Sequence, residues 1–97
     1  MVRGYETVLI VDAMLSDDLI ESVVKDVETF LTGKGQVKNV DRRGKRRLAF
    51  EINKKNHGHY TVFNYKAEGN AVTELERKLQ LNENVLRFLT VSRDMAE

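Results

Sequence analysis

The sequence reads YETVLIVDAMLSDDLIESVVKDVETFLTGKG over residues 5–35. The spacing of its apolar side chains changes once along this stretch, which predicts a strand followed by a helix. Residues 5–12 are rich in β-branched side chains, and their near-continuous apolar run indicates a strand at a central or doubly covered position. Between residues 19 and 31, apolar side chains recur at spacings of three and four, which lines one face of a helix. Ser16 is the expected N-cap, and the two glycines at the end of the stretch stop the helix.

The middle of the chain predicts two further strands. Residues 36–52 are extended and contain Gly44, so they form either one long strand with an irregularity at the glycine or the two arms of a hairpin around RRGK. The polar residues 53–58, NKKNHG, indicate a turn. Residues 59–67, HYTVFNYKA, then return as a strand with alternating aromatic side chains.

A second helix and a last strand complete the chain. Asn70 is the expected cap of a helix whose apolar face carries Ala71, Val72, Leu75 and Leu79. Residues 82–84, NEN, indicate a turn, and VLRFLTVS at 85–92 closes as a strand. The order βαββαβ predicts one α+β domain over residues 1–97. It is a ferredoxin-like sandwich in which two helices cover one face of a four-stranded antiparallel sheet.

Charge is unevenly distributed although the 97 residues sum to a net charge of +1. Residues 1–34 carry seven acids and three bases, residues 35–66 two acids and nine bases, and residues 67–97 six acids and four bases. The basic middle third predicts a surface for phosphate backbones or acidic partners. No cysteine is present, and the longest apolar run, Val8–Val11, is too short for a membrane helix, so we expect a soluble protein in a reducing, cytosolic setting.

The densest basic stretch is DRRGKRRLAFEI, residues 41–52. Its cationic residues are Arg42, Arg43, Lys45, Arg46 and Arg47. Three interpretations remain open from the residues alone: a solvated turn that keeps an edge strand from pairing with neighbours, a nuclear address, and a contact with phosphate.

One face of the predicted sheet has no helix to cover it. If alternate residues of the first strand, such as Leu9, face the helices, their neighbours point outward. The outward set is then Glu6, Val8, Ile10, Tyr60 and Val62. Its apolar members, Val8, Ile10, Tyr60 and Val62, form a patch larger than a monomer usually exposes, which favours a protein partner or RNA stacking over catalysis. A register slip of one residue would reverse the set.

Catalytic and metal chemistry find little support in the sequence. His57 and His59 have no third ligand nearby, and Asp17 with Asp18 is explained by helix initiation, because adjacent helical residues point apart. Ser16 lacks the context of a nucleophile elbow, and no glycine-rich phosphate loop is present. We therefore predict neither an enzyme nor a metal or cofactor site.

Two nucleotide- or phosphate-related families with this topology fit poorly. The third strand of an RNA recognition motif carries stacking aromatics, whereas His59, Thr61 and Asn64 occupy those positions here. An acylphosphatase-like enzyme needs an arginine in the loop after the first strand, where this chain has the acidic stretch DAMLSDD, residues 12–18.

Four segments, in order, resemble bacterial-type small-subunit ribosomal protein six. They are RGYETVLIVD (3–12), GKRRLAFEINK (44–54), GHY (58–60) and LNENVLRFLTV (81–91). The resemblance extends from Arg3 to Arg93 and departs at Glu51, where the family commonly has proline. It implies a structural component of the small ribosomal subunit, cytoplasmic and ribosome-associated, with no catalysis. It also implies cooperative binding, together with ribosomal protein eighteen, to the central domain of the small-subunit ribosomal RNA.

The resemblance and the strand pattern together give two sets of candidate residues. The candidates for RNA contact are Arg3, Lys45, Lys54, Lys55, Arg87 and Arg93. The candidates for contact with the protein partner are Glu6, Val8, Ile10, Arg46, Arg47, Phe50, Tyr60 and Val62. The alternative function is a homo-oligomeric ferredoxin-like module for protein interaction or small-ligand binding, since nothing in the sequence argues against self-association through an exposed edge.

Overall fold

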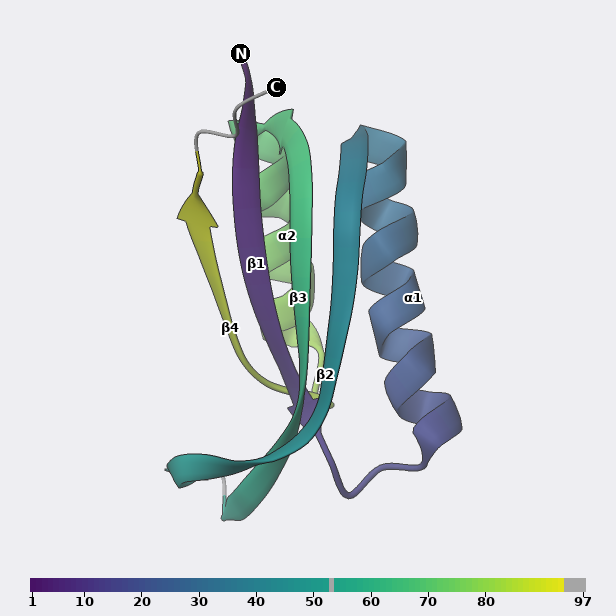
Figure 1. Ribbon diagram of the computed structural model, residues 1–97, viewed down its shortest axis with the longest axis vertical. Coiled ribbons are helices and arrows are strands. Elements are labelled where there is room, and N and C mark those ends of the chain that lie inside the picture. The colour runs from purple at the N-terminus through teal and green to yellow at the C-terminus, as the bar shows by residue number, and fades with distance from the viewer. Residues whose placement is uncertain (53, 94–97) are drawn as a thin grey trace.

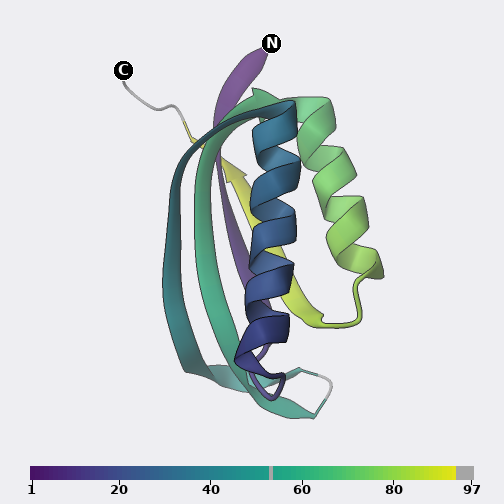
Figure 2. The ribbon, with the colours of Figure 1, turned by 90° about the vertical axis from the view of Figure 1, so that its right-hand side faces the viewer.

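The computed structural model describes residues 1–52 and 54–93, which form a two-layer α/β sandwich. The elements are β1 (Val2–Asp12), α1 (Asp17–Lys34), β2 (Gly35–Ile52), β3 (Lys55–Glu68), α2 (Gly69–Leu81) and β4 (Val85–Ser92). The strands pair antiparallel in the order β2-β3-β1-β4, and both helices lie on one side of this sheet (Figures 1 and 2). The predicted βαββαβ architecture is confirmed.

Helix α1 begins where the sequence predicts and ends at the second of the two predicted stop glycines, Gly35, whereas Gly33 lies inside the helix. The Leu19 amide donates to the Ser16 hydroxyl at 3.3 Å, so Ser16 is the N-cap. The helix passes directly into β2 at Gly35, where an added Cβ would overlap the carbonyl oxygen of Lys66. Glycine is therefore required for α1 and β2 to join this close to β3.

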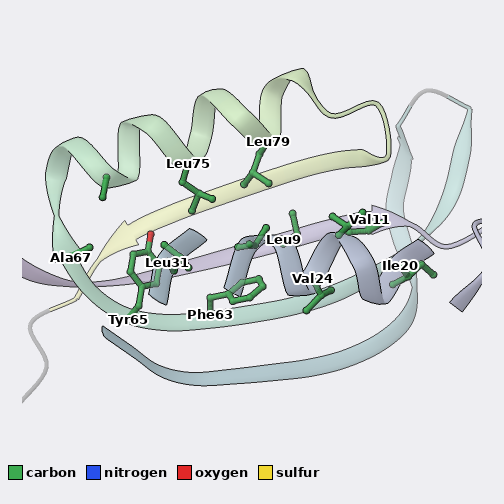
Figure 3. Close-up of a cluster of buried hydrophobic side chains, with 13 residues drawn as sticks. Leu9, Val11, Ile20, Val24, Leu31, Phe63, Tyr65, Ala67, Leu75 and Leu79 are labelled. Carbon is green, nitrogen blue, oxygen red and sulfur yellow. The ribbon is translucent and has the colours of Figure 1, made fainter. Parts of the chain in front are cut away.

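The core lies between the helices and the inner sheet face (Figure 3). Its fully buried large side chains include Leu9, Leu31, Phe63, Tyr65 and Leu75. The Tyr65 hydroxyl hydrogen-bonds the Thr7 hydroxyl at 2.9 Å, and Thr7 in turn contacts the Thr90 hydroxyl at 2.8 Å. These bonds satisfy a polar group that is buried in an apolar layer, and burial raises the pKa of Tyr65.

The predicted cap of the second helix is wrong. α2 begins at Gly69 and Glu68 occupies the N-cap position without a side-chain hydrogen bond, so Asn70 lies inside the first turn. The strand before it runs directly into the helix, which leaves no loop in which Asn70 could take the extended conformation of an N-cap.

The second strand is one long element, as the first of the two alternatives for residues 36–52 predicts. β2 pairs with β3 through register shifts at three places, one of them between Arg42 and Gly44, where Gly44 has a φ of +82°. The turn that follows is shorter than the predicted NKKNHG, because β3 already begins at Lys55, and Asn53 lies outside the described residues. The far ends of β2 and β3, residues 44–52 and 55–60, form an arm that bends sharply and reaches across the end of the sheet toward β4 (Figure 1).

Candidate partner and RNA interface

The sheet face that points away from the helices, here called the outer face, has the predicted alternation. Thr7, Leu9 and Val11 are fully buried on the helix side, so Glu6 and Val8 point to the outer face. No described helix covers the outer face (Figure 2).

Apolar residues of three strands adjoin on the outer face. Val8 of β1 lies between Val62 of β3 and Leu89 of β4 in the strand register. Leu89 is 61% exposed, and Val91, two residues further along β4, is 37% exposed. A monomer seldom exposes large side chains grouped in this way, so the outer face has the character of a contact surface.

Two residues predicted for partner contact are less accessible than the strand pattern suggests. Ile10 is only 8% and Val62 only 7% exposed. A Cβ built at Gly58 would overlap the Cγ2 of Ile10 and touch Leu48, so side chains from β1 and from the arm pack over this glycine. The arm therefore covers one end of the outer face from within the chain.

The arm also brings an exposed aromatic ring to β4. The Phe50 ring is 64% exposed, and its centroid lies 5.9 Å from the Arg87 guanidinium. Beside Arg87, a shallow hollow of about 280 Å³ is lined by Val8, Ile10, Arg87, Phe88 and Leu89. Phe50 and Arg87, predicted for different ligands, thus lie side by side.

Leu89 and Val91 lie outside both sets of residues predicted from the sequence. Both belong to VLRFLTVS, in which Arg87, Leu89 and Val91 alternate with residues that face the helices. Each of these three residues lies opposite an outward residue of β1. The alternation of β4 therefore predicts its outward residues once the facing of the neighbouring strand β1 is known.

The first arginine of the basic block stabilises the fold. Arg42 is opposite Thr61 in the register, on the helix side, and its guanidinium donates to both carboxylate oxygens of Glu21 in α1, at 2.8 and 3.1 Å. Glu28 adds a longer contact of 4.0 Å. The guanidinium lowers the pKa of Glu21, and the same hydrogen bonds raise the pKa of Arg42. This two-donor ion pair connects α1 to the edge strand.

The other cations of the block differ in their surroundings. Arg43 contacts Asp41 at 3.1 Å. Arg46 is opposite Gly58 on the outer side of the arm, whereas Arg47, as the next residue, points to the other side. Lys45, Arg46 and Arg47 are exposed and form no ion pair within residues 1–52 and 54–93. These three are the cations of the block that remain available to a ligand.

The remaining RNA candidates lie toward the two ends of the molecule, whose longest dimension is 39 Å. Lys54 is exposed in the turn of the arm with a φ of +63°, and Lys55 contacts Asp12 at 3.3 Å. At the opposite end, Arg3 is exposed near the start of β1, and the Arg93 amide donates to the Gly4 carbonyl at 2.7 Å.

The described residues contain neither a group of metal ligands nor a membrane-spanning helix. Among them, no three histidine, aspartate or glutamate side chains are grouped to hold a metal ion. Within the same residues, neither helix has the length and apolar character that crossing a bilayer requires.

Comparison with known proteins shows the family of this chain. A family model described as Ribosomal protein S6 matches residues 4–92. The small ribosomal subunit protein bS6 of Synechococcus elongatus is 44% identical over 92 residues, covering 94% of this chain and 86% of the relative. The same protein from another Synechococcus species is 45% identical and is covered over 97% of its length. The crystal structure of 30S ribosomal protein S6 from Thermotoga maritima is 29% identical. It aligns with a TM-score of 0.90 over 96% of this chain and 89% of that chain.

Proposed function

Since this chain belongs to the ribosomal protein S6 family of the small ribosomal subunit, we propose that it binds the central domain of the small-subunit ribosomal RNA together with ribosomal protein eighteen. The relatives are named as proteins of the small ribosomal subunit, not as enzymes, in agreement with the prediction of no catalysis. The protein is ribosome-associated, and the proposed setting is the cytoplasm.

The observation that carries the proposal is the outer face, apolar in its centre and basic toward both ends. Leu89 and Val91 are exposed there without a covering element among the described residues. At one end, the arm carries Lys45, Arg46 and Arg47, which form no ion pair within the described residues. The sequence predicts partner contact for Arg46 and Arg47; we propose that they contact RNA instead, because they are exposed cations on the two sides of the projecting arm. An apolar centre suits a protein partner, and a cationic margin suits an RNA backbone that passes beside that partner.

We propose that protein eighteen and RNA contact different parts of this surface. Ribosomal protein eighteen contacts Val8, Leu89 and Val91 on the outer face, and Phe50 and Tyr60 at its arm end. Ile10 and Val62 support this surface from below and contribute little direct contact, because less than a tenth of each is exposed. The RNA approaches along the arm and the basic ends, where arginine provides bidentate phosphate contacts and lysine a less directional charge.

A titration tests the proposal. A central-domain fragment of small-subunit ribosomal RNA is mixed with the chain alone, with ribosomal protein eighteen alone, and with both proteins. We expect tight binding by the pair and markedly weaker binding by either protein alone. Equal binding with and without protein eighteen would contradict the proposed cooperativity, and no binding under any condition would contradict the function.

A pair of variants tests whether the outer face, rather than the helix side, is the partner surface. Leu89→Asp places a charge in the centre of the outer face and is expected to abolish pairing with protein eighteen. Leu81→Asp is the matched control, because Leu81 is 77% exposed and ends α2, on the helix side of the sheet. If both variants pair normally, the outer face is not the partner surface. If the chain forms a discrete dimer that Leu89→Asp dissociates, the outer face joins two copies instead.

A further inference from the structure

One ion pair connects a residue proposed for partner contact with one proposed for RNA contact. The Arg93 guanidinium donates to Glu6 Oε1 twice, from Nε at 3.1 Å and from Nη2 at 2.8 Å. Glu6 belongs to β1, and Arg93 directly follows β4. In the free chain, these two candidate residues therefore neutralise each other's charge.

The position of Glu6 makes this pair sensitive to a partner on the outer face. Glu6 is flanked in the register by Asn64 of β3 and Val91 of β4, beside the apolar centre of the outer face. Its side chain is 24% exposed, so a partner that covers Val91 also approaches the Glu6 carboxylate. A cation on that partner would find an acceptor at Oε2, which receives neither of the bonds from Arg93.

Arg93 is held in place but remains accessible. Its amide donates to the Gly4 carbonyl at 2.7 Å, which fixes the backbone at the end of the sheet, while its side chain is 60% exposed. Arg93 can therefore exchange the carboxylate for a phosphate by a side-chain rotation. That exchange sacrifices the ion pair with Glu6 and leaves a carboxylate charge near the RNA.

We propose that the Glu6–Arg93 ion pair couples the two binding events: a cation of the protein partner takes over Glu6, and Arg93 is released to contact RNA phosphate. This inference rests on the proposed function. The partner thereby strengthens RNA binding. By reciprocity, RNA that holds Arg93 leaves Glu6 free and strengthens partner binding by the same factor. The factor is modest, about two- to five-fold, because exposed ion pairs are weak.

Substitutions that keep side-chain size test the coupling. Glu6→Gln removes the carboxylate charge that holds Arg93. Glu74→Gln is the matched control: it makes the same charge change at an ion pair with Lys34 of 3.3 Å, on the helix side of the molecule. RNA affinity is measured for both variants, for Arg93→Gln and for the double variant Glu6→Gln/Arg93→Gln, each with and without ribosomal protein eighteen. Thermal unfolding verifies that each variant is folded.

The coupling predicts a specific set of affinities. Without the partner, Glu6→Gln binds RNA about two- to five-fold more tightly than Glu74→Gln, and in the Arg93→Gln background this advantage disappears. The enhancement by the partner shrinks by the same factor in Glu6→Gln. Equal affinities for Glu6→Gln and Glu74→Gln, or an advantage that persists without Arg93, would overturn the coupling while the proposed function stands. If the unsubstituted chain binds no RNA even with the partner, the proposed function and the coupling both fail.

Discussion

Replacing Arg46 and Arg47 together by alanine should weaken assembly on RNA mainly through its dependence on salt. Both side chains are exposed on the arm and form no ion pair within the described residues, so they are available to phosphate in the free chain. They point to opposite sides of the arm, since Arg46 is opposite Gly58 and Arg47 is opposite His57. An RNA groove that receives the arm can contact both.

The expected magnitude follows from counterion release. Each phosphate contact contributes about 0.7–0.9 to the slope of log K against log salt, so losing two contacts reduces the slope by about 1.4–1.8. Between about 50 and 200 mM salt, the affinity ratio of the unsubstituted chain to the variant should therefore fall about tenfold.

The assay is a titration of the RNA fragment with the chain and ribosomal protein eighteen at four salt concentrations. Arg42→Ala is the control from the same basic block, because the Arg42 guanidinium is already held by Glu21 at 2.8 Å. It should lower the free energy of unfolding by up to about 1 kcal/mol and leave the salt slope nearly unchanged. An unchanged slope for the Arg46/Arg47 variant, or an equal change for Arg42→Ala, would refute the distinction between paired and unpaired cations.

Three further substitutions test how the fold supports the interface. Glu21→Gln should destabilise the protein at pH 7. Since the hydrogen bonds from Arg42 lower the folded-state pKa of Glu21, the deficit should start to shrink below about pH 4 and be lost as pH falls through that lowered pKa, in urea unfolding measured across pH. Tyr65→Phe should cost about 1 kcal/mol through the lost bond to Thr7. Because burial raises the pKa of Tyr65, the unsubstituted protein should lose stability as the pH rises from about 10 through that raised pKa, whereas Tyr65→Phe should show no such loss in chemical unfolding. Gly58→Ala should cost about 1–3 kcal/mol by overpacking beneath the arm; equal unfolding midpoints for variant and parent would show that the arm adjusts freely.

Much of the fold is predictable because local and long-range signals agree. The apolar period changes once between residues 5 and 35, and the N-cap at Ser16 and the glycine at position 35 fall where that change requires them. The facing of β1 follows from the same period, since Leu9 belongs to the apolar layer that the helices must cover. Asn70 shows the limit, because a favourable cap residue is overridden when β3 runs directly into α2.

The shape of the interface is less predictable because it depends on contacts between distant segments. Alternation correctly assigns Ile10 to the outer face but does not reveal that the bent arm brings Leu48 over Gly58 beside it. The bend arises from register shifts and the positive φ of Gly44, and the sequence shows only that an irregularity is possible there. A local pattern thus predicts which way a side chain points, but not what covers it.

The basic block shows why a cluster of charges in sequence is not one site in space. Arg42 and its neighbours share a charge, but the register directs Arg42 toward the acidic side of α1, where Glu21 neutralises it. Arg46 and Arg47, a few residues along the same strand, lie beyond the reach of the helix on the projecting arm. The first arginine therefore anchors the strand from which the other two project. If the proposed interface is correct, removing the anchor changes stability and removing the projecting pair changes binding, although all three substitutions delete the same charge.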